Sequence, residues 1–219
     1  MTPIDQLIRS PRLPQFVREL EHILKEERRR RRRFFKEVRE DQKAEFINGE
    51  VIMHSPVGLE HNEVSMNLVA LMRAYVQRNS LGVVGHEKLL ISLTRNDYEP
   101  DICYFVADKA KKFKRDQNKF PAPDLIVEVL SKSTERFDRS IKFDDYAAHG
   151  LSEYWIVDPR KKTIEQFLLA ADRYELAVKM HDGVIQSQAI KGFAMPVGAA
   201  FNAGENMKAL TAMMAELHD

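Results

Sequence analysis

The segment that most constrains the fold is a near-continuous apolar run, Pro123-Asp-Leu-Ile-Val-Glu-Val-Leu, just past the middle of the chain. Such runs are typical of strands that are buried on both faces of a sheet. A second buried run, Glu153-Tyr-Trp-Ile-Val-Asp-Pro, follows it. The residues between them have the apolar spacing of a helix that ends near Gly150, and Ser133 or Thr134 can cap its start. The order strand, helix, strand predicts a right-handed crossover between parallel strands.

Shorter patterns of helix and strand surround this crossover. Asn48-Gly49 separates two short strand patterns and favours a type I′ hairpin turn, because both residues tolerate positive φ angles. We therefore predict an α/β fold, an α+β arrangement with a mixed sheet, flanking helices and an antiparallel C-terminal meander. The predicted helices are 14–43, 59–79 and 204–217, and the remaining predicted strands are 82–86, 88–93, 101–106, 163–169, 174–180 and 184–189.

Length and composition set the broad class of the protein. The 219 residues suit one large domain with an appendage, so we expect an N-terminal helical extension over 1–40 and a main domain over 41–219. A single cysteine excludes an intramolecular disulfide and fits a reducing compartment. No apolar run approaches 18 residues, so we expect no membrane span and a cytoplasmic location. The net charge of +1 gives no global basic field, and nucleic-acid binding would require a local patch.

Two carboxylates lie at the ends of strands that are expected to be neighbours. Glu128 interrupts the apolar run, where an ionised carboxylate is costly unless it is paired or binds a metal. Strand alternation places Glu128 on the same face as Ile126 and Leu130. Asp101 follows Pro100 at the start of another strand. Two carboxylates with water suit Mg²⁺ or Mn²⁺, which prefer oxygen ligands, so the pair predicts a divalent-metal site of nuclease type.

Two basic clusters allow either a solvated surface or phosphate binding. Six consecutive arginines, Arg28 to Arg33, lie in the first predicted helix, where nearby glutamates can pair with them. A long helix at this place also invites contact with a partner subunit. Six more basic residues lie in the turn-rich stretch from Lys109 to Lys119, which is either a mobile solvated loop or a phosphate-binding loop beside the carboxylates. The candidate nucleic-acid contacts are Lys111, Lys112, Lys114 and Arg115.

Several other reactive or aromatic side chains have a core role as their simplest interpretation. His61 lies on the buried stripe of the predicted helix 59–79, and a site contact is its alternative. Cys103 lies in a predicted strand and is expected to be a small core residue rather than a catalytic thiol. Tyr146, Tyr154 and Trp155 have the spacing of side chains that are buried against the sheet.

An ordered set of motifs resembles a known family. The pieces are Glu45-Phe-Ile-Asn-Gly-Glu, Ser55-Pro56 with His61, Pro100-Asp101, Glu128-Val-Leu-Ser, Lys142 with Tyr146, and Glu153-Tyr-Trp-Ile-Val-Asp-Pro. Each piece alone is weak, but in this order, over roughly residues 40–200, they resemble the Uma-two family. Its members are restriction endonuclease-like proteins of the PD-(D/E)XK nuclease superfamily. The resemblance implies a restriction endonuclease-like core of helix, antiparallel strands, crossover helix and parallel strand.

The resemblance also implies roles for individual residues. Asp101 and Glu128 match the metal-binding pair, and Glu45 resembles the family's additional acidic residue. The residue two positions after Glu128 is Leu130, so the literal Glu-x-Lys of the superfamily is absent. In this family a lysine on the following helix takes over, and Lys142 is that residue here.

Two questions about the lysine remain open at this point. The alternative role of Lys142 is an ion pair with Asp138, one helical turn earlier. Lys132 is a rival, because it is nearer to Glu128 in the sequence and replaces a residue that is often proline in relatives.

The function that the resemblance implies is hydrolysis of DNA phosphodiester bonds by a metal-dependent endonuclease that acts as a homodimer. Mg²⁺ or Mn²⁺ would be its cofactor. The alternative is a module on a nuclease fold that binds nucleic acid or protein without cutting. The shifted lysine and the near-neutral net charge leave room for this second interpretation.

Overall fold

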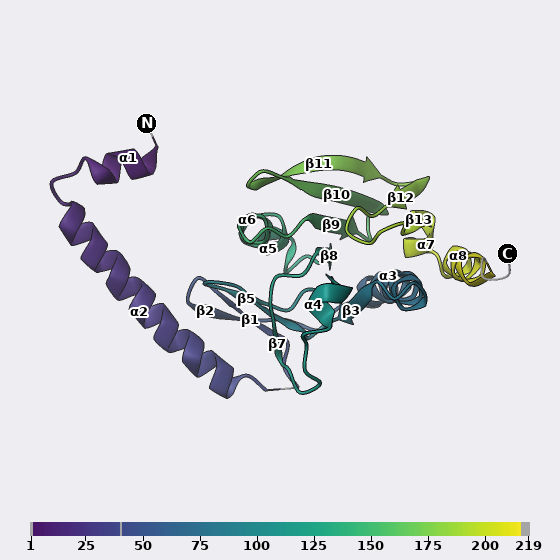
Figure 1. The fold of residues 1–219 in the computed structure, drawn as a ribbon, viewed down its shortest axis with the longest axis horizontal. Coiled ribbons are helices and arrows are strands. Elements are labelled where there is room, and N and C mark those ends of the chain that lie inside the picture. Colours follow the sequence, from purple (N-terminus) through teal and green to yellow (C-terminus); the bar gives the residue numbers. More distant parts are fainter. Residues whose placement is uncertain (1, 40, 216–219) are drawn as a thin grey trace. The chain divides into compact units, whose positions relative to one another are not determined.

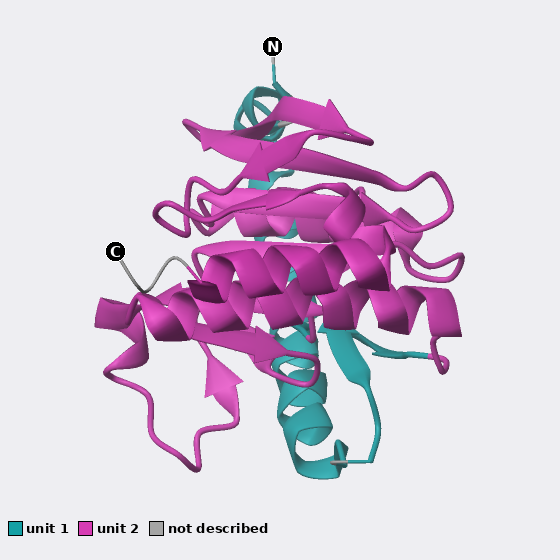
Figure 2. Ribbon diagram, turned by 90° about the vertical axis from the view of Figure 1, so that its right-hand side faces the viewer, with its two compact units in different colours: residues 1–54, 94–98 teal, residues 55–93, 99–219 magenta. Residues whose placement is uncertain are grey.

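The computed structural model describes residues 2–39 and 41–215, and the chain forms two compact units. Unit 1 comprises residues 1–54 and 94–98, and unit 2 comprises residues 55–93 and 99–219 (Figure 2). The hairpin that follows the N-terminal helix thus belongs to the same unit as the helix. The division into an extension over 1–40 and a main domain over 41–219 stays a prediction.

Unit 1 is built from two helices and three short strands. Thr2 caps the first helix with a reciprocal pair of bonds, because its hydroxyl accepts from the Asp5 amide at 3.2 Å and its own amide donates to the Asp5 carboxylate at 2.8 Å. The long second helix ends at Glu37, because Val38 adopts an extended backbone. This end lies six residues before the predicted position 43. The elements are α1 Pro3–Ile8, α2 Leu13–Glu37, β1 Ala44–Ile47, β2 Glu50–Met53 and β5 Asp97–Tyr98 (Figure 1).

The predicted hairpin turn is confirmed. Asn48 and Gly49 have φ angles of 50° and 85°, and Ile47 pairs with Glu50 across the turn. A side chain at position 49 would also meet the Glu27 Cγ atom of α2 at 2.8 Å. Glycine is therefore needed here both for its φ angle and for the close approach of α2.

The second half of α2 is held against the hairpin and the segment 94–98. The guanidinium of Arg31 makes two bonds to the buried Asp97 carboxylate, at 2.6 and 2.7 Å. Phe34 packs on Phe46 of β1 with ring centroids 5.8 Å apart, and Arg95 binds Glu27. Within the arginine run, Arg31 thus makes a bidentate pair with a buried carboxylate, whereas Arg29 and Arg33 pair with exposed glutamates of the same helix.

Unit 2 holds most of the regular structure. Its N-terminal part comprises α3 Leu59–Arg78, β3 Gly82–His86, β4 Leu90–Ser92, β6 Ile102–Val106, α4 Ala107–Ala110, β7 Lys119–Phe120 and β8 Leu125–Val129. The remainder comprises α5 Glu135–Asp138, α6 Ile141–Ala148, β9 Glu153–Asp158, β10 Thr163–Ala170, β11 Arg173–Met180, β12 Val184–Gln186, β13 Ala194–Pro196, α7 Gly198–Phe201 and α8 Ala203–Ala215.

A six-stranded mixed sheet organises unit 2. The strand order is β11-β10-β9-β8-β6-β3. Strands β8 and β9 are parallel, with Leu125 opposite Glu153, and α5 and α6 connect them. The other neighbours in this sheet are antiparallel. The predicted crossover and the mixed α+β fold are therefore confirmed.

The two faces of the sheet bury different side chains. Leu125, Val127 and Val129 join a core cluster with α3, α7 and α8 on one face. Helix α6 covers the opposite face, where Phe143 makes edge contacts with Tyr154 and Tyr174. Because side chains alternate along a strand, Glu128 belongs to the face that α6 covers. Tyr146, Tyr154 and Trp155 are fully buried, as predicted.

Three local predictions need correction. The strand predicted at 184–189 does not extend the meander, because β12 pairs with β13 in a separate two-stranded sheet. The crossover helix is broken after Arg139, since Ser140 leaves helical geometry. Thr134 occupies the N-cap position of α5, as predicted, but its side chain makes no cap bond within the described residues. The predicted end of the last helix at residue 217 lies outside the described residues.

Candidate metal centre

Asp101 and Glu128 lie side by side at the ends of β6 and β8. The two strands pair with Ile102 opposite Val127, which brings the next residues together. The Asp101 carboxylate accepts a hydrogen bond from the Val129 amide at 2.9 Å, and the Asp101 amide lies 3.4 Å from Glu128 Oε2. Both side chains are buried, with 5% and 3% exposure. The predicted juxtaposition of the two carboxylates is thus present.

Lys142 reaches this pair from α6. Its ammonium lies 3.1 Å from Glu128 Oε1 and 3.1 Å from Asp138 Oδ1, and only 2% of the side chain is exposed. The Tyr146 hydroxyl lies 3.5 Å from the same Glu128 oxygen. Residues four apart share a helix face, so Lys142 and Tyr146 present both groups to Glu128. Lys142 thus contacts both Asp138, its alternative ion-pair partner, and Glu128 of the candidate site, and its role as the site lysine stays a prediction.

The helix break explains why Lys142, rather than Ile141, faces the sheet. Ser140 resets the helical phase, so α6 presents Lys142 inward and leaves Ile141 half-buried. The Tyr154 hydroxyl of β9 holds the chain at this break, because it donates a hydrogen bond to the Asp138 carbonyl at 3.0 Å. Burial, with the nearby charges of Glu128 and Asp138, raises the pKa of this hydroxyl well above its ordinary value, so it remains a donor.

His61 contacts Asp101 from the other side. It lies on the first turn of α3, and its Nε2 atom is 3.2 Å from Asp101 Oδ2. The second ring nitrogen, Nδ1, is buried and has no hydrogen-bond partner in the part of the chain that the structure describes. His61 is therefore a buried residue of α3, and it also contacts Asp101 of the candidate site. Both interpretations of the sequence, core residue and site contact, agree with this position.

The other lysine and the basic loop are exposed. Lys132 points to solvent, whereas Lys142 makes the contact with Glu128. In the loop, Lys109 is tied to Asp124 at 2.9 Å and Lys111 to Asp108 at 3.2 Å. The candidate nucleic-acid contacts all have exposed side chains, namely Lys111, Lys112, Lys114 and Arg115.

Glu45 is a buried acid in unit 1. It lies on β1, its side chain is 1% exposed, and its Oε2 atom is 3.1 Å from His54 Nε2. Sequence reasoning did not single out His54. The two-residue turn at 48–49 places His54 opposite Lys43, which makes His54 a diagonal neighbour of Glu45 on the paired strand. The register of the predicted hairpin could therefore have identified His54 as the partner of Glu45.

The donor set fits a hard divalent cation. Among the described residues, no three His, Cys, Asp or Glu side chains gather to hold a metal from protein groups alone. Mg²⁺ usually takes only one or two carboxylates and fills its remaining positions with water and substrate phosphate. Asp101 and Glu128 would hold such an ion through carboxylate oxygens. Cys103, next to them on β6, offers no competing thiolate, because burial raises its pKa to about 12.

The family match spans the site and most of the chain. Residues 28–198 match the family described as "Uma2: Putative restriction endonuclease". The chain belongs to the Uma2 family. The family resemblance inferred from the motifs is therefore confirmed. Outside this match lie α1, the part of α2 before Arg28, most of α7 and all of α8.

This Uma2 protein is similar to two proteins of known sequence and to one solved structure. Two similar proteins from Synechocystis sp. are "Uncharacterized protein sll1609", 29% identical over 66% of this chain and 82% of its own length, and "Uncharacterized protein slr1290", 27% identical over 60% and 68%. A crystal structure from Anabaena variabilis, described as a "putative nuclease belonging to DUF820", superposes with a TM-score of 0.67. It is 18% identical and covers 77% of this chain and 94% of its own, so it supports the fold.

Regarding membranes, every helix within the described residues falls short of the length or hydrophobicity that a membrane span requires.

Proposed function

We propose that this protein is a metal-dependent endonuclease that hydrolyses DNA phosphodiester bonds. The observation that carries the proposal is the buried contact between Lys142 and Glu128 beside Asp101. An ammonium buried against two carboxylates adds little net stability to a fold, because desolvation of the charges offsets much of their attraction. Such a cluster is therefore better explained by a functional role. Family membership as a restriction endonuclease-like protein supports the same conclusion.

Each residue of the site has a proposed task. Asp101 and Glu128 would hold Mg²⁺ or Mn²⁺, which when bound polarises the phosphodiester and lowers the pKa of an attacking water. Lys142 would donate to the phosphate oxygens where negative charge develops. His61 would orient the Asp101 carboxylate through their 3.2 Å contact. The additional acidic role of Glu45 stays a prediction from the family resemblance.

The basic loop supports a nucleic-acid substrate. Lys112, Lys114 and Arg115 are exposed in the segment between α4 and β7. Clustered cations of this kind bind phosphates without reading the base sequence. The homodimer that the family resemblance implies is a further part of the proposal.

The test is cleavage of supercoiled plasmid with Mg²⁺ or Mn²⁺. Asp101→Asn and Glu128→Gln keep side-chain size but remove a charged metal ligand, so we expect each to lower the cleavage rate by at least about 100-fold. Addition of EDTA should abolish wild-type cleavage. The matched control is Asp182→Asn, which alters an exposed carboxylate and should cut at the wild-type rate.

The outcomes separate the two candidate functions. Equal nicking by the wild type and all three variants would identify a contaminating nuclease and overturn the assignment. Absence of cleavage together with DNA affinity that is unchanged by Asp101→Asn would favour the alternative, a non-cleaving binding module. Circular dichroism of each variant distinguishes a disrupted site from a disrupted fold.

A further inference from the structure

Unit 1 exposes an unusual number of apolar side chains. Among the described residues, nine of the eighteen exposed large hydrophobic side chains lie in this unit, although it is much the smaller of the two. Large contiguous apolar patches on a protein surface commonly mark interaction sites. Those on the two helices are Ile4, Leu7, Ile8, Val17, Leu20, Ile23 and Leu24.

Four of these side chains form a ridge along the first half of α2, namely Val17, Leu20, Ile23 and Leu24. Leu13, Leu20, Glu27 and Phe34 are spaced by seven residues, so the exposed ridge continues the face that packs on the hairpin. Within α2, the buried residues are Glu27 and Phe34, both in the second half. Figure 1 shows the second half beside β1 and β2, and the first half extending beyond them. The first half thus has an apolar face that the hairpin does not cover.

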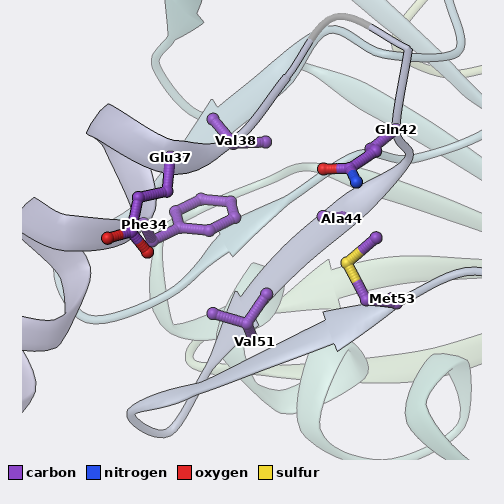
Figure 3. Close-up of a pocket in the computed structure, with 7 residues that line it drawn as sticks. All are labelled: Phe34, Glu37, Val38, Gln42, Ala44, Val51 and Met53. Atoms are coloured by element: carbon purple, nitrogen blue, oxygen red, sulfur yellow. The ribbon is translucent and has the colours of Figure 1, made fainter.

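The same unit carries an apolar hollow. A pocket of about 150 Å³ lies between the C-terminal end of α2 and the hairpin (Figure 3). Its apolar lining comes from Phe34, Val38, Ala44, Val51 and Met53. Val51 and Met53 on β2 are 49% and 54% exposed. One unit therefore presents both a ridge and a hollow that apolar side chains would fill.

The residues that flank the ridge change from acidic to basic along α2. Glu19, Glu21 and Glu26 flank the ridge, and Arg18 and Lys25 lie farther around the helix. Arg28 and Arg33 occupy the same flanks in the second half, because they follow Glu21 and Glu26 by seven residues. A second α2 in the antiparallel direction would place acidic flanks opposite basic flanks. A parallel neighbour would place like charges together.

We propose that α2 forms a two-fold symmetric dimer with a second copy of this chain. The two α2 helices run antiparallel, and the ridge of each copy lies against the hollow and β2 of the other. A two-fold interface requires one surface that is complementary to itself, and unit 1 offers an apolar ridge with an apolar hollow, and acidic flanks with basic ones. The ridge precedes the residues that match the family, whereas the hollow and β2 lie within them.

The first experiment measures the mass of the full chain in solution by light scattering across a concentration series. We expect the wild type to have about twice the chain mass of 25.4 kDa. Leu20→Glu with Ile23→Glu changes two exposed side chains and should give a folded monomer. The matched control, Leu176→Glu with Val184→Glu, places the same charges at exposed apolar positions of unit 2 and should remain a dimer.

A second experiment tests the antiparallel direction by charge exchange. One variant carries Glu19→Arg and Glu21→Arg, and the other carries Arg28→Glu and Arg33→Glu. Each alone would place like charges together, and we expect its dissociation constant to rise more than about tenfold. An equimolar mixture should form heterodimers with nearly wild-type affinity, because each repelling flank then meets its opposite.

Three results would overturn the proposal. These are a monomeric wild type at every concentration, a dimer that survives Leu20→Glu with Ile23→Glu, and a mixture of charge variants that associates no better than either alone. None of these measurements uses nuclease activity, so loss of the interface leaves the proposed cleavage of DNA untouched. A monomeric wild type would also contradict the homodimer that the proposed function includes, whereas the other two results would contradict this interface alone.

Discussion

At the scale of single residues, Lys142 lies 3.1 Å from carboxylate oxygens of both Glu128 and Asp138. The ammonium and both acids are nearly excluded from solvent. Removal of one member of such a group leaves a buried charge without compensation, which is far more costly than removal of a surface pair. Lys142 therefore has a structural task in addition to its proposed chemical one.

We predict that Lys142→Met lowers the free energy of unfolding by about 3 kcal/mol in denaturant titrations. Lys132→Met, an exposed change of the same kind, should alter it by less than about 0.5 kcal/mol. Adding Glu128→Gln to Lys142→Met should recover part of this stability, because it neutralises one of the two buried acids, Glu128 and Asp138, that the first change leaves without the ammonium. Equal effects of the two single lysine changes would contradict the buried network.

At the scale of elements, the break between α5 and α6 is tied to the sheet by Glu165 on β10. Its carboxylate accepts from Arg139 at 2.6 Å and from Lys179 of β11 at 2.7 Å. Burial raises the pKa of Glu165, but the bonds from Arg139 and Lys179 outweigh it and the net pKa is lowered. The charged form of this side chain therefore stabilises the fold.

A carboxylate whose pKa is lowered on folding stabilises the protein above its unfolded pKa and loses this effect as the pH falls through the folded value. We predict that Glu165→Gln costs about 1 kcal/mol of unfolding free energy at pH 7. The difference from wild type should shrink below about pH 4, near the ordinary pKa of glutamate. Thermal melts over this range measure it. Glu175→Gln, at an exposed position on β11, is the matched control and should change the free energy of unfolding by less than about 0.5 kcal/mol.

The hairpin turn gives a second test at this scale. We predict that Gly49→Ala destabilises the protein by more than about 1 kcal/mol, because its φ of +85° is strained for alanine and the added methyl would meet Glu27. Gly58→Ala is the matched control, since no heavy atom lies within 4 Å of the position of its added Cβ and its φ is −73°. Comparable destabilisation by both changes would mean that the turn is not constrained as described.

At the scale of the whole molecule, the net charge of +1 offers no long-range attraction for DNA. Affinity would depend on local cations, and each neutralised phosphate adds about 0.9 to the slope of log affinity against log salt. We predict that alanine at Lys112, Lys114 and Arg115 lowers this slope by about 0.9 for each phosphate that is no longer neutralised. Binding titrations at several salt concentrations measure it. An unchanged slope would exclude the loop between α4 and β7 from the interface.

The sequence by itself determined the pairing of the central elements. The buried runs at β8 and β9 and the crossover between them could be read directly, because a strand covered on both faces has a composition that few other elements share. Asn48-Gly49 specified its hairpin through local backbone preference alone. Asp101 and Glu128 followed from strand ends and from the cost of a buried acid, and the ordered motifs led to the Uma2 family.

Only the tertiary structure decided which groups surround that pair. Lys142 faces Glu128 because Ser140 interrupts the crossover helix and resets its phase, and no propensity in the sequence announced that break. Arg31 was indistinguishable from its five arginine neighbours until the segment 94–98 supplied Asp97. The contact of Lys142 with Glu128 joins residues 14 positions apart, and that of Arg31 with Asp97 joins residues 66 positions apart. Such contacts depend on packing that local pattern does not encode.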